Sequence, residues 1–278
     1  MRTAPAEDGQ PRSVTRKSEV TERITAVPGA QSNQALARGL HILRMLVDEG
    51  TPMTATEVGR RIGIHQSSAS RILATLGEVG YVRKSDNGQF EPDYGVLALG
   101  SATTRLPLIT RPREVFQEIV EENPYIGASM CMLFRDEMIY LLRARSGSDT
   151  LTFWSNGFPI NISAPGLRLL LDLPEHDATA ILQSSRQRFG WGGRPAVVPA
   201  TEAEVLAKAQ HLLHDEVLLL RDWHVDGETG GAIPIRTPEP HPVALALVDA
   251  SGTYSDERLT LLLHQARRRV EQAFHPED

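Results

Sequence analysis

The segment from residue 54 to residue 91 constrains the fold of this chain most, because several helix and turn signals follow one another within it. Thr54 stands three residues before Glu57, which is the capping-box signature of a helix start. That helix is short and stops at Gly63, and a tight turn over 63–65 leads into another helix. The apolar residues of this next helix recur at i, i+3, i+4 and i+7, namely Ala69, Ile72, Leu73 and Leu76.

A hairpin signal follows the second of these helices. Asn87-Gly88 lies between two short strand-like runs, and Asn-Gly in that position is a strong indicator of a tight hairpin turn. An earlier amphipathic helix is expected over 34–48, where Leu36, Leu40, Leu43 and Val47 recur at helical spacing. Three short helices followed by a hairpin predict a winged helix-turn-helix over residues 34–92.

The third predicted helix carries a polar face opposite its apolar stripe. Small hydroxyl side chains at the start of a helix let its backbone approach DNA, and one long arginine can reach the acceptors of guanine in the major groove. The hairpin offers cations where a wing would contact phosphates. We therefore expect DNA contacts from Ser67, Ser68, Ser70, Arg71, Thr75, Arg83 and Lys84.

The charge of the chain is divided unevenly between its two parts. The net charge of the 278 residues is −6, yet residues 1–92 hold 12 Lys and Arg against 10 Asp and Glu. The remaining residues hold 17 against 25. Only the first part therefore suits a phosphate backbone, and double-stranded operator DNA is the expected partner there.

The rest of the chain divides into a tail, a linker and a second domain. Residues 1–33 are polar without periodicity and are predicted to be a disordered tail, and 93–110 is predicted to be a linker helix that ends at Pro107. Residues 111–278 are predicted to form an α+β domain with an antiparallel sheet. Helices are expected at 112–122, 165–172, 175–184, 202–214 and 256–274, and strands at 127–134, 138–145, 150–155, 217–221, 231–236 and 243–249.

Several other classes of protein are disfavoured by the sequence. It has no nucleophile elbow, P-loop or dinucleotide fingerprint, so neither an enzyme nor a cofactor is expected. Its single cysteine, Cys131, excludes an intramolecular disulfide, and His211 and His214 have no third histidine at metal-ligand spacing. Its longest apolar runs are far shorter than the ~18 residues of a membrane helix, so a cytoplasmic location is expected.

Residues 34–100 resemble the DNA-binding domain of IclR-type transcriptional regulators. The resemblance runs through Gly-Ile-x-x-Ser-Ser-x-x-Arg-Ile-Leu-x-Thr-Leu at 63–76 and Gly-Tyr-Val at 80–82. It continues through 158–166, 227–235 and the helix start at 255–259, and so covers about 34–275. It implies a GAF-like, ligand-sensing second domain and a homodimer or homotetramer that binds an operator.

The resemblance also implies an effector pocket, with departures from the family pattern. The usual histidine is Asn161, the pocket cysteine is Gly230, and two positions that can be serine in sensors of small acids are Ala246 and Val248. The resulting wall is smoother and more apolar, which favours an aromatic or largely apolar metabolite over a small keto acid. The expected effector contacts are Met130, Asn161, Ser163, Ala164, Gly166, Asp222, Gly230, Ala246 and Val248.

Two functional hypotheses follow. The first is a transcription regulator, expected to be a repressor, in which two recognition helices of a dimer enter successive major grooves ~34 Å apart and an effector changes their placement. The alternative is an enzyme or a ligand-binding module with a vestigial DNA-binding domain. A vestigial domain has no reason to keep the hydroxyl and arginine face at 67–71 together with a cationic wing.

Overall fold

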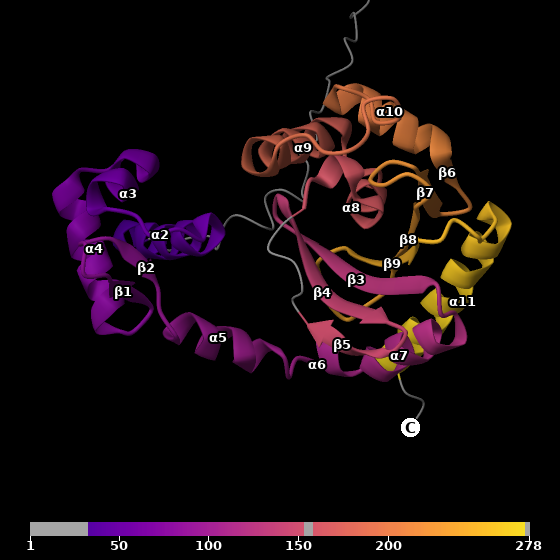
Figure 1. Cartoon of the computed structure of the whole chain (residues 1–278), viewed down its shortest axis with the longest axis horizontal. Helices are drawn as coiled ribbons and strands as arrows, with labels where there is room; N and C mark the ends of the chain where they lie inside the picture. Colours follow the sequence, from indigo (N-terminus) through magenta and orange to yellow (C-terminus); the bar gives the residue numbers. More distant parts are fainter. Residues whose placement is uncertain (1–32, 153–157, 276–278) are drawn as a thin grey trace, which may run out of the picture.

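A computed structural model describes residues 33–152 and 158–275 of the chain. The predicted tail, except for its last residue, and the end of the strand predicted at 150–155 lie outside these ranges. Figure 1 shows a smaller, mainly helical N-terminal unit (residues 33–92) beside a larger α+β C-terminal unit (residues 111–275), with helix α5 between them.

The N-terminal unit contains the three helices and the hairpin that the sequence predicts. They are α2 (Gln34–Glu49), α3 (Ala55–Ile62), α4 (Gln66–Glu78), β1 (Val82–Lys84) and β2 (Phe90–Pro92). The capping box is formed, because the Glu57 amide donates to Thr54 Oγ1 at 3.2 Å and the Thr54 amide donates to Glu57 Oε2 at 2.7 Å. Gly63 ends α3 with φ 72°, a left-handed conformation that favours glycine. The winged helix-turn-helix prediction is confirmed.

A compact apolar core holds these helices together. Ile42 and Leu46 of α2, Val58 of α3 and Leu73 of α4 are fully buried in it. A Cβ atom at Gly59 would lie 2.9 Å from the carbonyl oxygen of Ile64, so the turn between α3 and α4 packs directly on the α3 backbone. The position of α4 against α3 is therefore rigidly set.

Two helices connect the units, where one was predicted. They are α5 (Gly95–Thr103) and α6 (Pro107–Thr110). Pro107 begins α6 instead of only ending the linker helix, because a proline at the first helical position loses no hydrogen bond. Several apolar side chains of α5 stay exposed, among them Leu97 and Leu99.

The C-terminal unit is built on a seven-stranded antiparallel sheet in the order β5-β4-β3-β9-β8-β7-β6. This confirms the predicted α+β fold with an antiparallel sheet. The strands are β3 (Ile126–Phe134), β4 (Glu137–Arg145), β5 (Ser148–Thr152), β6 (Leu213–His214), β7 (Val217–Arg221), β8 (Thr229–Ile235) and β9 (Val243–Asp249). The helices are α7 (Arg113–Glu122), η1 (Ile160–Ile162), α8 (Ala164–Leu170), α9 (Glu175–Phe189), α10 (Glu202–Leu212) and α11 (Asp256–Phe274).

Helices cover both faces of this sheet and create two separate cores. Helices α7 and α11 pack on one face, where Phe116 and Leu263 are fully buried, and α8, α9 and α10 cover the other, where Leu167 and Leu182 are fully buried (Figure 1). Within the described ranges, every helix is too short or too polar to cross a bilayer.

Several element boundaries differ from the prediction, and among them are two helix ends. The helix predicted over 202–214 ends at Leu212, because Leu213 is extended and pairs with Leu218 at the sheet edge. Helix α9 continues to Phe189, beyond the predicted end at 184. The first difference arises from strand pairing at the sheet edge, which overrides the local periodicity.

Candidate DNA-binding and effector sites

The predicted DNA-reading residues lie along one side of α4. The side chains of Ser67, Arg71 and Thr75 are exposed, and those of Ser68 and Ser70 are half-buried. Thr75 Oγ1 donates to the carbonyl oxygen of Arg71 at 3.1 Å, so this hydroxyl is engaged by its own helix. Ser67 Oγ lies 2.9 Å from Nδ1 of His65, the residue that caps α4. Arg71 is therefore the long side chain with hydrogen-bond donors that this face of α4 exposes to solvent.

A groove of about 550 Å³ lies between the start of α3, helix α4 and the hairpin. Ser70 and Lys84, both predicted DNA contacts, line it together with Thr54, Thr56 and Gln66, which the sequence reasoning did not select. The signal that could have identified Thr56 and Gln66 is their position in the first turn of a helix. Backbone amides at helix starts can donate to phosphate oxygens.

The two predicted wing cations differ in their surroundings. Arg83 Nε donates to Glu91 Oε1 at 2.8 Å, and this hydrogen bond raises the pKa of Arg83. The Arg83 guanidinium also lies 5.7 Å from the ring centre of Tyr94. Lys84 lies 5.7 Å from the ring centre of Phe90 and lines the groove. Lys84 is thus the hairpin cation that lies beside α4, whereas Glu91 offsets the charge of Arg83.

The C-terminal unit contains a cavity of about 740 Å³ between the sheet and the start of α8. Two rows of paired residues form its floor. Arg143, Ser129 and Ala246 make one row across β4, β3 and β9, and Arg145, Gly127, Val248 and Gly230 make the next row, which extends to β8. Small residues in the middle of both rows leave space for the cavity. The β4 member of each row is an arginine.

The wall of the cavity carries hydroxyl and aromatic groups. Tyr140 Oη lies 3.0 Å from Ser163 Oγ, which also accepts a hydrogen bond from the Gly166 amide at 3.1 Å. Burial raises the pKa of the Tyr140 phenol, so the hydroxyl stays protonated. Phe158 packs edge-to-face on Tyr140 and on His224, with ring centres 6.3 Å and 5.3 Å apart. The cavity thus combines apolar area with hydroxyl donors and guanidinium groups.

Five of the expected effector residues line this cavity: Ser163, Ala164, Gly230, Ala246 and Val248. The other four lie outside its lining and need correction. Met130 is fully buried on the opposite face of the sheet, in the core formed with α7 and α11, because successive side chains of a strand alternate between faces. Gly166 lies behind Ser163, where a Cβ atom would be 3.0 Å from Ser163 Oγ.

Asn161 and Asp222 instead form hydrogen bonds with the backbone of nearby loops. The Asn161 amide donates to the Gly192 carbonyl at 2.8 Å and accepts from the Gly192 amide at 3.2 Å, so both of its polar atoms are used. Asp222 accepts a hydrogen bond from the Gly227 amide at 2.7 Å and lies 3.8 Å from Arg194. Both residues hold the backbone of neighbouring loops in place.

The sequence reasoning missed Tyr140, Arg143 and Arg145 of β4. Strict alternation along the strand would place Tyr140 and Arg143 on opposite faces. A β-bulge breaks the alternation, because Met130 pairs with Leu142 while Cys131 pairs with Tyr140, which leaves Leu141 as the extra residue. Both side chains consequently face the cavity, and no local sequence signal marks the bulge.

The described part of the chain contains no group of three or more histidine, cysteine, aspartate or glutamate side chains placed to hold a metal ion. Cys131 is fully buried, and burial raises its pKa, so the sulfur stays a thiol. This residue packs as a small apolar side chain.

Comparison with known proteins agrees with this geometry. Residues 35–86 match the model of the IclR helix-turn-helix domain. No curated protein sequence matches the chain significantly. Similar solved structures include an IclR family transcriptional regulator from Brucella abortus, with 22% identity and a TM-score of 0.70 over 90% of this chain and 97% of that one. An IclR transcriptional regulator from Alicyclobacillus acidocaldarius shares 18% identity, with a TM-score of 0.63 over 87% and 99% of the two chains.

A third similar structure contains a ligand. It is an IclR homologue from Microbacterium hydrocarbonoxydans complexed with 4-hydroxybenzoate, with 21% identity and a TM-score of 0.60 over 87% of this chain and 100% of that one. The domain match covers the helices and the start of the hairpin described above, and the shared fold extends through the C-terminal unit. Residues 35–86 therefore form a helix-turn-helix domain of the IclR type, and the chain as a whole shares the fold of these regulators.

Proposed function

We propose that this protein is a cytoplasmic transcription regulator that binds double-stranded operator DNA through α4 and the wing. The observation that carries the proposal is the exposed α4 face with Arg71, beside a groove lined by Ser70 and Lys84. An α-helix enters the major groove, where arginine distinguishes guanine from other bases, while a wing lysine contacts phosphates. Occupation of promoter DNA excludes polymerase sterically, so we propose repression as the output.

The regulator acts as a homo-oligomer in this proposal. Leu36, Leu40 and Val47 of α2 form an exposed apolar stripe at i, i+4 and i+11, and Leu97 and Leu99 of α5 add further exposed apolar area. A second copy of the chain is the occupant we propose for the stripe, because operator recognition needs two reading helices at a set spacing. The partly buried Leu43 continues the stripe into the core of the unit.

The effector we propose is a small aromatic acid. The cavity joins an apolar floor of Gly230, Ala246 and Val248 to the guanidinium groups of Arg143 and Arg145. A planar apolar body suits that floor, and a carboxylate suits an arginine, which can bind it through two hydrogen bonds. The 4-hydroxybenzoate bound by the Microbacterium homologue belongs to this chemical class.

A binding assay with DNA tests the main proposal. The duplex is the DNA upstream of the protein's own gene, and the control is a scrambled duplex of equal length and base composition. We expect tighter binding to the upstream duplex, with a difference that persists when salt weakens both. Equal affinity for the two duplexes would contradict operator recognition and favour a ligand-binding module with a vestigial reading helix.

Calorimetry tests the effector class. We expect heat of binding from 4-hydroxybenzoate and benzoate and none from glyoxylate or pyruvate, because the small keto acids leave most of the apolar floor uncovered. Tight binding of the keto acids without binding of the aromatic acids would show that the effector class is wrong.

A further inference from the structure

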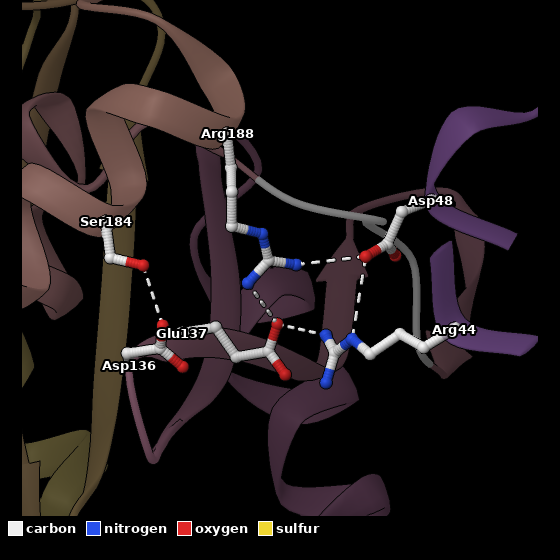
Figure 2. Close-up of polar contacts among 6 residues, drawn as sticks. All are labelled: Arg44, Asp48, Asp136, Glu137, Ser184 and Arg188. Carbon is white, nitrogen blue, oxygen red and sulfur yellow. Dashed lines mark hydrogen bonds and ion pairs between the residues drawn. The ribbon is translucent and has the colours of Figure 1, made fainter. Parts of the chain in front are cut away.

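Four charged side chains form a closed ring between the two units (Figure 2). Arg44 and Asp48 come from α2, Glu137 begins β4, and Arg188 lies near the end of α9. Arg44 bonds to Glu137 Oε2, Arg188 bonds to the same oxygen at 3.0 Å and to Asp48 Oδ2 at 3.2 Å, and Arg44 lies 3.5 Å from Asp48. Opposite charges therefore alternate around the whole ring.

The ring is where the two units are joined by polar contacts. Within the described ranges, the hydrogen bonds and ion pairs that link residues 33–92 with residues 111–275 all belong to it. Glu137 is the most protected member, with a side chain 12% exposed, whereas that of Arg44 is 48% exposed. Water and salt consequently reach part of the ring, and such pairs are individually weak and screened.

Of the two C-terminal elements in the ring, β4 lines the cavity directly, and α9 is hydrogen-bonded to the segment that leads to the cavity. Strand β4 carries Glu137 at its start and, further along, Tyr140 and Arg143, which line the cavity. A change in the position of β4 at the cavity would therefore act directly on Glu137.

Helix α9 provides the second connection between the cavity and the ring. Its Ser185 Oγ accepts a hydrogen bond from the Ile160 amide at 3.0 Å, at the start of the segment that leads to Ser163. Its Ser184 donates to Asp136 at 2.7 Å and so ties the β3–β4 turn to the same helix (Figure 2). Arg188 of the ring follows one helical turn after Ser184. Both routes from the cavity thus end at the ring.

We propose that this ring is a latch that docks the DNA-binding unit on the effector unit, and that its opening and closing regulate operator binding. The inference rests on the proposed function and concerns the route by which the cavity controls the reading helix. A latch suits this role when it is weak enough for a ligand to open, since a ligand shifts an equilibrium only by its differential affinity for the two states.

Paired charge swaps test the latch. The first variant exchanges the α2 charges (Arg44→Glu with Asp48→Arg), and the second exchanges the effector-unit charges (Glu137→Arg with Arg188→Glu). Each variant keeps the net charge of the chain and the opposite charges of the pair within its own unit. Only the contacts between the two units change, because like charges now face each other there. The quadruple variant restores opposite charges across the ring and is the matched control for both.

The first readout is the distance between the units, measured without DNA or effector. Spin labels on Asp86→Cys in the wing and Gln210→Cys on α10 are suitable, because both positions are exposed and the native Cys131 is fully buried. We expect a narrow distance distribution in the parent protein, a broad one in each swap, and a narrow one again in the quadruple variant. High salt should broaden the parent distribution. Identical distributions in all four proteins would overturn the latch.

The second readout is affinity for the upstream DNA. We expect both swaps to change this affinity at least fivefold and the quadruple variant to restore it. Equal affinities in all four proteins would overturn the regulatory role, even if the distances change. Failure of the parent protein to bind this DNA would instead contradict the proposed function, while the distance measurement would still report on the latch.

Discussion

Arg71 is the residue on which operator preference should depend. It is exposed on α4, opposite the buried Ala69 and Leu73. We expect Arg71→Ala to reduce the ratio of upstream to scrambled DNA affinity by about 1–3 kcal/mol per half-site and to leave the fold intact. Competition titrations measure the ratio, and Arg268→Ala, which removes an exposed arginine from α11, is the matched control. An unchanged ratio would mean that Arg71 does not read bases.

Lys84 should behave differently, because an interaction with a phosphate carries no sequence information. We expect Lys84→Ala to weaken binding to the upstream and scrambled duplexes equally. The slope of log K against log salt concentration should decrease by about 1 for each phosphate that the wing no longer neutralises. Arg83→Ala should change the slope less, because Glu91 already offsets the charge of Arg83. Weakening confined to one base position would make Lys84 a base-reading residue.

Asp249 should make the stability of the C-terminal unit depend on pH. Burial opposes its ionisation, but hydrogen bonds from Ser251, Tyr254 and Gly252 outweigh burial and lower the pKa of Asp249 below the ordinary 3.8. A carboxyl group with a lowered folded-state pKa stabilises the fold above its unfolded-state pKa, and this stabilisation is lost as the pH falls through the folded-state pKa.

We therefore expect Asp249→Asn to lower the free energy of unfolding at pH 7 by about 1–3 kcal/mol, because the amide replaces a charged hydrogen-bond acceptor with a neutral one. The difference in free energy of unfolding between the variant and the parent should become smaller as the pH falls below 3.8, because the Asp249 carboxylate of the parent is then protonated. Thermal melts across this range measure the difference, with Asp86→Asn in the exposed wing turn as the control. A stability difference that does not depend on pH would contradict the lowered pKa of Asp249.

At the scale of elements, α2 has three faces with separate roles. Ile42 and Leu46 pack into the core, Arg44 and Asp48 belong to the latch, and the stripe that includes Leu40 is left exposed. At 3.6 residues per turn the core residues lie apart from the other two sets, whereas Leu40 and Arg44 are one helical turn apart, so the exposed stripe borders the latch.

We expect Leu40→Asp to produce a folded monomer, because the side chain is 59% exposed in the free chain and a buried charge would disfavour the dimer. Binding to the upstream DNA should weaken accordingly, since a single reading helix makes too few contacts. Sedimentation velocity measures the mass, and Arg38→Asp on another exposed part of α2 should keep the mass of the parent. Parental mass in Leu40→Asp would place the interface elsewhere.

At the scale of the whole molecule, an effector should stabilise the fold that contains its cavity. At 100 times its Kd, 4-hydroxybenzoate should add about 2.7 kcal/mol to the free energy of unfolding of the parent protein. Arg143→Gln should weaken its binding more than it weakens the binding of phenol, because phenol has no carboxylate. Thermal shifts and calorimetry measure both effects, with Arg236→Gln, at an exposed position away from the cavity lining, as the control. Equal weakening for both ligands would show that Arg143 does not hold a carboxylate.

The winged helix-turn-helix could be predicted from the sequence because its signals are local. Thr54 with Glu57, Gly63, the apolar stripe of α4 and Asn87-Gly88 each act within a few residues, and the structure forms the cap, turn, helix and hairpin that they indicate. The antiparallel α+β class of the second unit followed from strand runs and short turns in the same way.

The cavity of the C-terminal unit and the ring of ion pairs were decided only by tertiary structure. The bulge at Leu141 turns Tyr140 and Arg143 toward the same cavity, and Met130 turns away from it, because strand register is set by pairing with distant strands. Asn161 meets Gly192, and Arg44 meets Glu137, across long stretches of chain. By itself, therefore, the sequence determined most of the elements and the polar face of α4 that we propose to read DNA, because the interactions that form them are local. The packing of remote segments determined which side chains share a site, because their proximity exists only after the chain has folded.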